Sequence, residues 1–157
     1  MNLYTFGYEG LNLDAFIARL KEVNVQQIVD VREYPLSRKK GFSKNALLAA
    51  LVVNGIDYLH MAALGCPKGI RQRYKADGDW RAYEKNFRAY LKTQSKAVHS
   101  VAQLARRKTT CLICFEADYS RCHRSFVARA AVASGAPLLA HLTPERAIAD
   151  APFQAAA

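Results

Sequence analysis

The residues best suited to chemistry lie close together in the segment from 109 to 124, TTCLICFEADYSRCHR. The first part of this segment is apolar and β-prone, which predicts a buried strand that ends near Cys114. A polar loop follows, and Cys122 then opens a stretch that predicts a helix. Thiol, carboxylate, imidazole and guanidinium groups therefore meet where a strand passes into a helix. In open α/β sheets, ligands bind beyond the carboxyl ends of the strands, so we expect the site here.

Each of these side chains has a chemical role and a structural alternative. Cys122 is a candidate nucleophile, because a helix N-terminus and neighbouring arginines favour a thiolate, or a small buried residue that packs the helix onto the sheet. His123 can act as a general base, donate to a phosphate or cap the helix. Arg124 is suited to bind an anion, and Glu116 can act as a general acid or base or neutralise the arginines. Cys114 would contact the substrate or replace Cys122 as nucleophile.

The four cysteines do not form a recognised metal pattern. Cys111 and Cys114 form a Cys-x-x-Cys, but three positions along a strand place the two side chains on opposite faces, which argues against a redox pair or a shared zinc ion. Cys111 is therefore expected in the core. Cys114 and Cys122 can approach each other, and His123 or Cys66 would complete a conceivable zinc set. Because the spacing matches no zinc motif, we expect no metal.

A second group of polar residues lies between Asp30 and Lys44. Asp30, a candidate general acid or base, and Arg32 fall at the end of a predicted strand, and a basic loop with Ser37 and Arg38 leads into a predicted helix. Backbone N–H groups, the helix dipole and these cations favour an anion, and each arginine can hold a phosphate by two hydrogen bonds. The alternatives are a solvated basic loop and a structural Asp30–Arg32 ion pair. The sequence contains neither a P-loop nor a dinucleotide-binding glycine motif.

Strands and helices alternate along the chain. The strands are expected at 3–7, 27–31, 56–60, 109–115 and 137–142, and the helices at 13–23, 44–53, 80–94, 95–107, 122–134 and after Thr143. The aromatic stripe of the 80–94 helix is expected to pack in the core. Residues 61–78 are expected to be irregular, either functional or a surface excursion. This order predicts a single-domain, Rossmann-like three-layer α/β sandwich, with a mostly parallel sheet of about five strands and helices on both faces.

The polar residues at the strand ends are expected at one edge of this sheet, because the carboxyl ends of parallel strands share an edge. One crevice should therefore be lined by Tyr8, Glu9, Asp30, Arg32, Cys114, Glu116, Cys122, His123 and Arg124. The expected catalytic residues are Asp30, Glu116, Cys122 and His123. The expected substrate-binding residues are Tyr8, Glu9, Arg32, Ser37, Arg38, Lys44, Cys114 and Arg124.

The composition is that of one basic globular domain. With 157 residues, 51% of them hydrophobic, the chain can form one core, expected over residues 1–150 with a frayed tail at 151–157. A net charge of +10 favours a phosphate-bearing small molecule or nucleic acid as partner, or gives only a basic surface. The N-terminus lacks a signal-peptide pattern and no apolar run reaches membrane-spanning length, so we expect a cytoplasmic protein with free thiols and no membrane contact. The sequence names no cofactor and no oligomeric state.

Several short motifs occur in the order typical of one family. They are Thr5-Phe6-Gly7-Tyr8, Asp30-Val31-Arg32 with Pro35 and Ser37-Arg38, Gly41-Phe42-Ser43-Lys44, Tyr58-Leu59-His60, Leu64-Gly65, Cys114-Phe115-Glu116 and Cys122-His123-Arg124. With these motifs the chain resembles, over nearly its whole length, the family catalogued as domain of unknown function 488. The resemblance implies a compact α/β protein and no particular reaction, and it supports the expected crevice.

The chain is also similar, more weakly, to rhodanese-type domains. In those domains an Asp-x-Arg follows an early strand, and a later strand ends in a cysteine that precedes a loop, an Arg-Ser and a helix. Here Asp30-Val31-Arg32 and Cys114 with Arg124-Ser125 correspond. The loop is longer in this chain and holds two carboxylates, which argues against a tight ring of N–H groups around the sulfur.

Three functions follow from these patterns. The first is an enzyme for a phosphate-bearing substrate, in which the arginines and Lys44 hold the anion and His123 with a carboxylate transfers protons. The second is a thiol-based sulfur-transfer enzyme with Cys114 or Cys122 as nucleophile. The third is a non-catalytic nucleic-acid-binding module built on the same crevice. The sequence does not choose between enzyme and binding protein.

Overall fold

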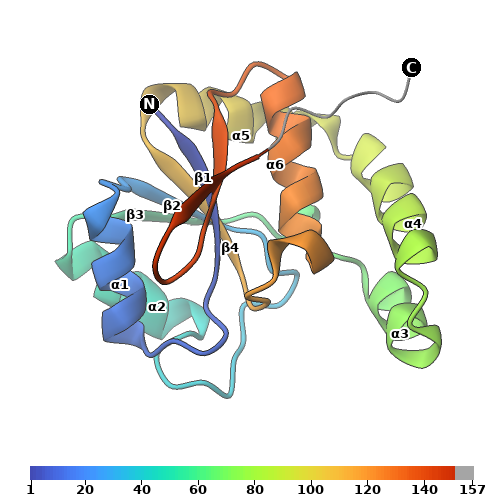
Figure 1. The fold of residues 1–157 in the computed structure, drawn as a ribbon, viewed down its shortest axis with the longest axis horizontal. Helices are drawn as coiled ribbons and strands as arrows, with labels where there is room; N and C mark the ends of the chain where they lie inside the picture. Colours follow the sequence, from blue (N-terminus) through green and yellow to red (C-terminus); the bar gives the residue numbers. More distant parts are fainter. Residues whose placement is uncertain (151–157) are drawn as a thin grey trace.

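Six strands form one mixed sheet in the computed structural model, which describes residues 1–150 (Figure 1). The strands are β1 (Leu3–Gly7), β2 (Gln27–Asp30), β3 (Asp57–His60), β4 (Thr110–Cys114), β5 (Leu139–Leu142) and β6 (Ala147–Ala149). Their order across the sheet is β3-β2-β4-β1-β5-β6. The first five pair in parallel, and β6 is antiparallel to β5. The predicted mostly parallel α/β sheet is confirmed, with one strand more than expected.

Helices cover both faces of this sheet (Figure 1). They are α1 (Leu13–Glu22), α2 (Lys44–Val53), α3 (Lys68–Asp77), α4 (Trp80–Lys92), α5 (Ser95–Arg107) and α6 (His123–Ala133), with short 3-10 turns η1 (Ala62–Leu64) and η2 (Tyr119–Arg121). One apolar cluster joins α1 and α2 to the sheet through residues such as Phe6 and Ile28. The other joins α4, α5 and α6 to the opposite face through residues such as Leu3 and Val29. Because side chains alternate along a strand, each strand supplies both cores.

Local capping sets several helix boundaries. Oδ1 of Asn12 accepts a hydrogen bond from the N–H of Ala15 at 2.8 Å at the start of α1. Oδ1 of Asp79 accepts one from the N–H of Ala82 at 3.0 Å at the start of α4. Both bonds satisfy N–H groups that the first helical turn leaves without a partner. After α6 the chain adopts the left-handed conformation at Gly135, whose φ is 100°.

Two segments differ from the sequence-based expectation. The helix expected after Thr143 is wrong, because the Thr143 N–H donates to the Arg146 carbonyl at 2.8 Å and the chain returns as β6. This hairpin gives the open edge of β5 a partner, which outweighs the helix-start signal of the proline. Residues 61–78 are not irregular, because they contain η1 and α3. α3 buries no side chain, so it lacks the apolar periodicity that marks a helix.

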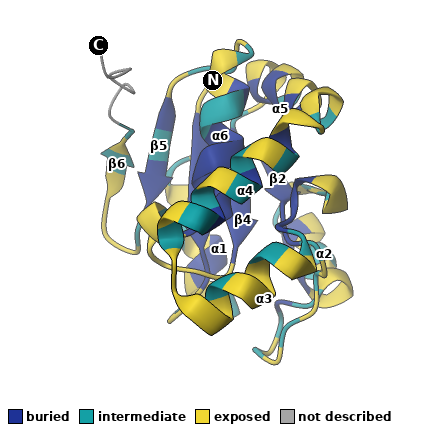
Figure 2. Cartoon of the chain, turned by 90° about the vertical axis from the view of Figure 1, so that its right-hand side faces the viewer, coloured by how far each residue is buried: buried dark blue, intermediate teal, exposed yellow. Residues whose placement is uncertain are grey.

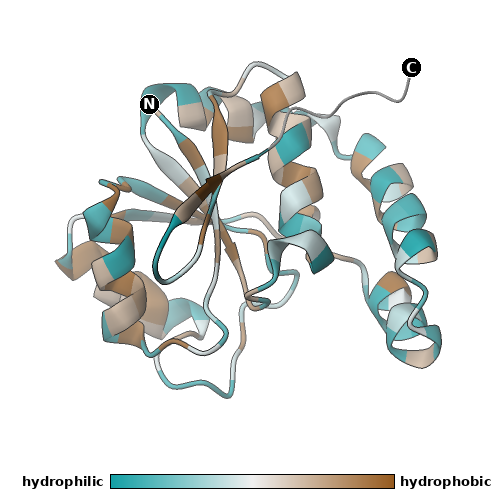
Figure 3. Ribbon diagram, in the orientation of Figure 1, coloured by the Kyte–Doolittle hydropathy of each residue, from teal (hydrophilic) through white to brown (hydrophobic). Residues whose placement is uncertain are grey.

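α3 and α4 lie together outside the sheet. Figure 2 shows α4 in front of the buried strands with α3 below it, both with exposed residues along their outer surfaces, and Figure 3 shows both as largely hydrophilic. α4 buries Tyr83, Phe87 and Leu91 on one stripe, which confirms the expected core packing. No helix within residues 1–150 is both long and apolar enough to cross a membrane. The tail expected at 151–157 lies outside the described residues.

Candidate functional site

The carboxyl ends of β1, β2 and β4 open into a pocket of about 740 Å³. The strands are neighbours, and their pairing places Gly7 beside Cys114 and Asp30 beside Ile113. Of the residues expected to share a crevice, those that line this pocket are Tyr8, Arg32, Cys114, Glu116 and His123. The remaining ones, which do not line it, are Glu9, Asp30, Cys122 and Arg124.

Asp30 and Arg32 form a buried ion pair at the edge of the pocket. Arg32 donates from Nε to Oδ1 of Asp30 at 2.9 Å and from Nη2 to Oδ2 at 2.7 Å, and the Tyr58 hydroxyl donates to Oδ2 at 2.5 Å. Nη1 of Arg32 donates to the Phe42 carbonyl at 2.6 Å and to the Tyr8 hydroxyl at 3.1 Å. The backbone N–H of Arg32 also donates to Oδ1 of Asp30, at 3.2 Å, and the carboxylate is fully buried. This geometry corresponds to the structural ion pair, not to an Asp30 that exchanges protons with a substrate.

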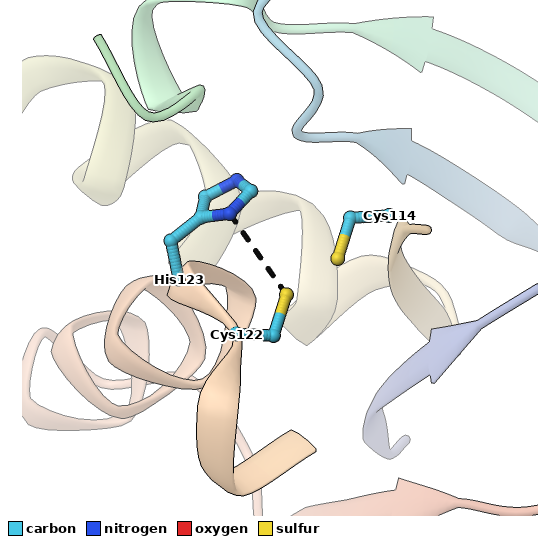
Figure 4. Close-up of side chains that lie close together, drawn as sticks. All are labelled: Cys114, Cys122 and His123. Atoms are coloured by element: carbon cyan, nitrogen blue, oxygen red, sulfur yellow. Dashed lines mark hydrogen bonds between the residues drawn. The ribbon is translucent and has the colours of Figure 1, made fainter. Parts of the chain in front are cut away.

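Two thiols, a carboxylate and an imidazole meet at the floor of the pocket. The thiols of Cys114 and Cys122 both donate to Oε2 of Glu116, at 3.2 and 3.4 Å. Nδ1 of His123 lies 3.8 Å from the Cys122 sulfur, along the dashed line in Figure 4. Cys114 ends β4, whereas Cys122 and His123 stand at the start of α6. The loop between β4 and α6 therefore brings the two sulfur atoms together, as the sequence suggested.

The backbone after β2 fixes the orientation of His123. Its Nε2 lies 2.7 Å from the carbonyl oxygen of Val31. A carbonyl can only accept a hydrogen bond, so Nε2 carries the proton. In the neutral ring Nδ1 then has no proton and presents its lone pair toward the Cys122 sulfur. An edge contact with Phe87, with 5.4 Å between ring centroids, supports this orientation. His123 can therefore accept a proton or bind a metal ion through Nδ1.

Arg124 lies behind the sulfur atoms and not in the pocket. It is fully buried, and its Nη1 donates to the Cys114 sulfur at 3.3 Å and to the Glu116 carbonyl. Its Nη2 donates to the Ala117 carbonyl at 3.4 Å. Burial raises the pKa of the Cys114 thiol well above its usual value, and the Arg124 charge opposes that rise only in part. Arg124 therefore acts on the sulfur and on the loop, and an anion in the pocket would not touch it.

The two carboxylates that follow β1 and β4 differ in their surroundings. Burial acts to raise the pKa of Glu116, but hydrogen bonds from its own backbone N–H and from Cys114, with the nearby His123, hold that pKa below its usual value. Glu116 is therefore an anion at neutral pH. Glu9 instead accepts a hydrogen bond from the Ala117 N–H at 3.0 Å and ties the end of β1 to the loop after β4.

The basic loop before α2 lies outside the pocket. The Ser43 hydroxyl donates to the Ser37 carbonyl at 3.2 Å and accepts from the Ser37 N–H at 3.0 Å. The Ser43 side chain thus closes the loop and makes no capping hydrogen bond to α2. Arg38 and Lys44 are exposed, and neither lines the pocket. The structure therefore does not bring Ser37, Arg38 and Lys44 to the crevice at the strand ends.

A wall formed by α3 and the start of α4 completes the pocket, and the sequence did not place it there. Apart from Gln72, its side chains are cationic or aromatic: Lys68, Arg71, Tyr74, Lys75, Trp80, Tyr83 and, from η2, Arg121. Trp80 and Tyr83 stack with 4.7 Å between ring centroids, and the Arg121 guanidinium lies 5.5 Å from the Trp80 centroid. The only sequence signal was the density of cations within residues 61–78, which did not indicate the face they would share.

Comparison with known proteins finds one family. Residues 12–131 match a family model described as domain of unknown function DUF488, a span that includes the pocket wall and the sulfur atoms. No curated protein and no solved structure matches the chain. The similarity to rhodanese-type domains gains no support, and the donor to the Cys114 sulfur is the Arg124 guanidinium.

Proposed function

The chain belongs to the family described as domain of unknown function DUF488, and we propose that it binds and acts on a phosphate-bearing ligand, a nucleotide or a nucleic acid. The observation that carries this proposal is the charge of the pocket. Two carboxylates line it, Glu33 and Glu116, against five cationic side chains: Arg32, Lys68, Arg71, Lys75 and Arg121. A cleft lined mainly by one sign of charge concentrates ligands of the opposite sign.

Most of this positive charge has no counter-ion in the protein. Arg71 lies 3.8 Å from Glu33. Within residues 1–150, Lys68, Lys75 and Arg121 form no ion pair with a carboxylate. All three are exposed, so an entering phosphate would gain their charge without breaking an existing pair.

The aromatic side chains of the pocket favour a ligand that also carries a ring. Tyr74 and Trp80 are half-buried in the pocket wall. Two further lining rings are largely exposed, Tyr34 at 61% and Phe115 at 45%. Aromatic side chains stack on nucleobases, each stack contributing about 1–3 kcal/mol. A nucleotide therefore uses more of this pocket than inorganic phosphate does.

Glu116 favours catalysis over simple binding. An ionised carboxylate repels an anionic ligand, so a module that only binds phosphate gains nothing from a carboxylate at its floor. Glu116 and His123 both line the pocket, and each can accept or donate a proton. Proton transfer is therefore assigned to this pair, whereas the fully buried Asp30 holds Arg32 in place.

A thiol-based sulfur-transfer enzyme is the second candidate. The observation that favours it is the separation of 3.8 Å between Nδ1 of His123 and the Cys122 sulfur. Transfer of the thiol proton to Nδ1 would leave a nucleophilic thiolate beside the pocket. This candidate requires that Cys122 or Cys114 alkylates rapidly at neutral pH, and slow alkylation of both would exclude it.

Equilibrium binding of nucleotides tests the first proposal. Replacing Lys75 and Arg121 together by alanine should weaken nucleotide binding at least about tenfold, since each lost charged hydrogen bond is worth about 1.5–3 kcal/mol. Arg73→Ala is the matched control, because Arg73 is an exposed cation of α3 outside the pocket lining. Unchanged affinity in the double variant would contradict the proposal. Binding of oligonucleotides alone, steeply lost with salt and without turnover, would identify the non-catalytic nucleic-acid module instead.

A further inference from the structure

We propose that Cys114, Cys122 and His123 form a binding site for a Zn²⁺-type divalent ion at the floor of the pocket. One ligand atom from each residue lies within 4.8 Å of the other two, and all three residues are buried. Two thiolates and an imidazole are ligands that zinc favours in proteins. The inference goes beyond the proposed phosphate-bearing ligand, because the binding of that ligand by the cationic wall requires no metal.

The separation between the ligand atoms of His123 and Cys122 is close to that of a tetrahedral site. Zinc–sulfur bonds of about 2.3 Å and zinc–nitrogen bonds of about 2.05 Å, meeting at about 109°, place sulfur and nitrogen about 3.5 Å apart. Nδ1 of His123 and Sγ of Cys122 are 3.8 Å apart. Closing this difference of about 0.3 Å is within reach of side-chain rotation about χ1 and χ2. Figure 4 shows the two sulfur atoms and the imidazole converging on a common space.

The ring of His123 is already oriented for a metal. Its Nε2 donates to the Val31 carbonyl at 2.7 Å, which leaves Nδ1 as the ligand atom on the side of the sulfurs. A histidine that binds a metal through one nitrogen almost always donates its other N–H to a carbonyl, a carboxylate or water. The Val31 contact therefore supplies the outer hydrogen bond that a metal-binding imidazole requires.

The charges around the site balance when a divalent ion is bound. Each cysteine binds as a thiolate and gives its proton to solvent. The two thiolates and the Glu116 carboxylate then carry three negative charges, and the ion with the Arg124 guanidinium carries three positive ones. Arg124 donates to the Cys114 sulfur at 3.3 Å, which is the kind of outer contact that stabilises a bound thiolate. The buried guanidinium is therefore compatible with a cation in front of it.

Three protein ligands leave one position of a tetrahedral ion for water or a ligand. Cys114 and His123 line the pocket, so this position faces the pocket and its cationic wall. Oε2 of Glu116 contacts both sulfur atoms and stands next to it. An open fourth position is typical of catalytic zinc sites, whereas structural sites have four protein ligands. Cys111 does not contribute, because it packs in the apolar cluster on the opposite face of the sheet.

A metal at this site would change the role of the sulfur atoms. Bound to an ion, Cys114 and Cys122 are ligands, and their alkylation is slow until the metal is removed. The thiol-enzyme candidate makes the opposite prediction, with rapid alkylation of the purified protein. The alkylation rate of the purified protein therefore distinguishes a metal site from a thiol enzyme.

Metal content and cobalt spectroscopy test the inference on the complete chain. Protein purified under reducing conditions without chelator should contain about one zinc ion per chain. After the metal is stripped, one equivalent of Co²⁺ should give a thiolate-to-cobalt charge-transfer band in the near ultraviolet and the visible bands of tetrahedral cobalt. Cys122→Ser and His123→Ala should each weaken Co²⁺ binding at least about 100-fold, since even the loss of an outer-shell contact costs 10- to 100-fold.

Cys111→Ala is the matched control, because it removes a fully buried thiol from the same strand as Cys114 but on the opposite face. This variant should bind Co²⁺ like the unmodified protein. The cobalt spectrum of the unmodified protein reports on thiolate coordination even where Cys122→Ser fails to fold. Absence of the charge-transfer band, or unchanged Co²⁺ affinity in a folded Cys122→Ser, would overturn the inference. Neither result affects binding of the phosphate-bearing ligand, which depends on Lys75 and Arg121. With a metal on Nδ1 of His123, proton transfer is left to Glu116 alone.

Discussion

The guanidinium of Arg124 lies 3.3 Å from the sulfur of Cys114, and neither side chain is more than 2% exposed. A buried charge is costly unless hydrogen bonds satisfy it. Arg124 donates to the carbonyls of Glu116 and Ala117 as well, while its Nε has no acceptor among residues 1–150. One side chain thus joins α6 to the loop after β4 and places a positive charge beside the sulfur atoms.

Replacing Arg124 should therefore affect primarily the stability of the fold. Arg124→Met leaves the carbonyls of Glu116 and Ala117 without their donor, and we expect the free energy of unfolding to fall by about 2–4 kcal/mol. Arg121→Met removes an exposed arginine and should change the free energy of unfolding by less than about 0.5 kcal/mol. Urea unfolding followed by circular dichroism measures both. A loss below about 1 kcal/mol in Arg124→Met would show that the buried contacts contribute little.

The Asp30–Arg32 pair gives a test that separates structure from catalysis. Asp30→Asn leaves the Arg32 guanidinium buried without its counter-charge, which should lower the free energy of unfolding by about 3–5 kcal/mol. Tyr58→Phe removes only the hydroxyl that donates to Asp30, and it should lower the free energy of unfolding by about 1–2 kcal/mol. Urea midpoints of the two variants give the comparison. An Asp30→Asn protein that is fully stable yet inactive would restore Asp30 as a catalytic residue.

The architecture and the position of the site could be predicted from the sequence, because both depend on the local pattern of residues. Apolar runs marked the strands, and the parallel topology then required Cys114, Glu116 and the start of α6 to share an edge with Tyr8 and Arg32. The features that could not be predicted depend on tertiary contacts. α3 buries no side chain, so nothing in its spacing revealed a helix or the pocket wall it forms. The burial of Arg124 was equally unpredictable from the sequence. Arginine side chains are mostly exposed, so an arginine at a strand end is expected to face a ligand in solvent.

A chain of hydrogen bonds joins Thr5, His141, Asp150 and Arg129 on the β5–β6 side of the sheet. Nδ1 of His141 lies 2.7 Å from the Thr5 hydroxyl, and Nε2 lies 2.8 Å from Oδ1 of Asp150, which also accepts from Arg129 at 2.9 Å. The order resembles a hydrolase triad. Thr5 and His141 are fully buried and neither lines the pocket, so we assign this network to stability.

The same network should make the fold sensitive to acid. Burial lowers the pKa of His141 and outweighs the upward effect of Asp150, while hydrogen bonds from Arg129 and His141 lower the pKa of Asp150 against the effect of its burial. Both groups thus bind protons more readily in the unfolded chain, so stability falls as the pH drops below about 6.5 for His141 and further near about 4 for Asp150.

Urea midpoints measured at about pH 7.5 and about pH 5.5 test whether stability falls with pH as expected. These pH values lie about one unit either side of the usual histidine pKa. His141→Gln should flatten the dependence over that interval. His99→Gln, at an exposed position of α5, should leave the slope unchanged. Stability that stays level or rises as the pH falls would contradict the assigned direction of the His141 shift.

Gly7 couples the end of β1 to the loop that carries Glu116. A Cβ added to Gly7 would lie 1.8 Å from the Glu116 carbonyl oxygen, and the same two segments are joined by a hydrogen bond from the Glu9 N–H to the Phe115 carbonyl at 2.8 Å. Gly7→Ala must therefore push the loop away from β1 and disturb the position of the Glu116 carboxylate. We expect a loss of about 1–3 kcal/mol in unfolding free energy, as for other overpacked sites.

Gly69→Ala provides the matched comparison for this substitution. Gly69 lies in α3, where an added Cβ meets no atom within 4 Å, so alanine should stabilise the protein by about 0.4–1 kcal/mol through the lower entropy of the unfolded chain. Because the displaced loop also carries the lining ring of Phe115, nucleotide binding should weaken in Gly7→Ala, and it should stay unchanged in Gly69→Ala. If Gly7→Ala proved as stable and as competent in binding as the unmodified protein, the loop would be free to move, and Glu116 would not be held at the pocket floor by its contact with β1.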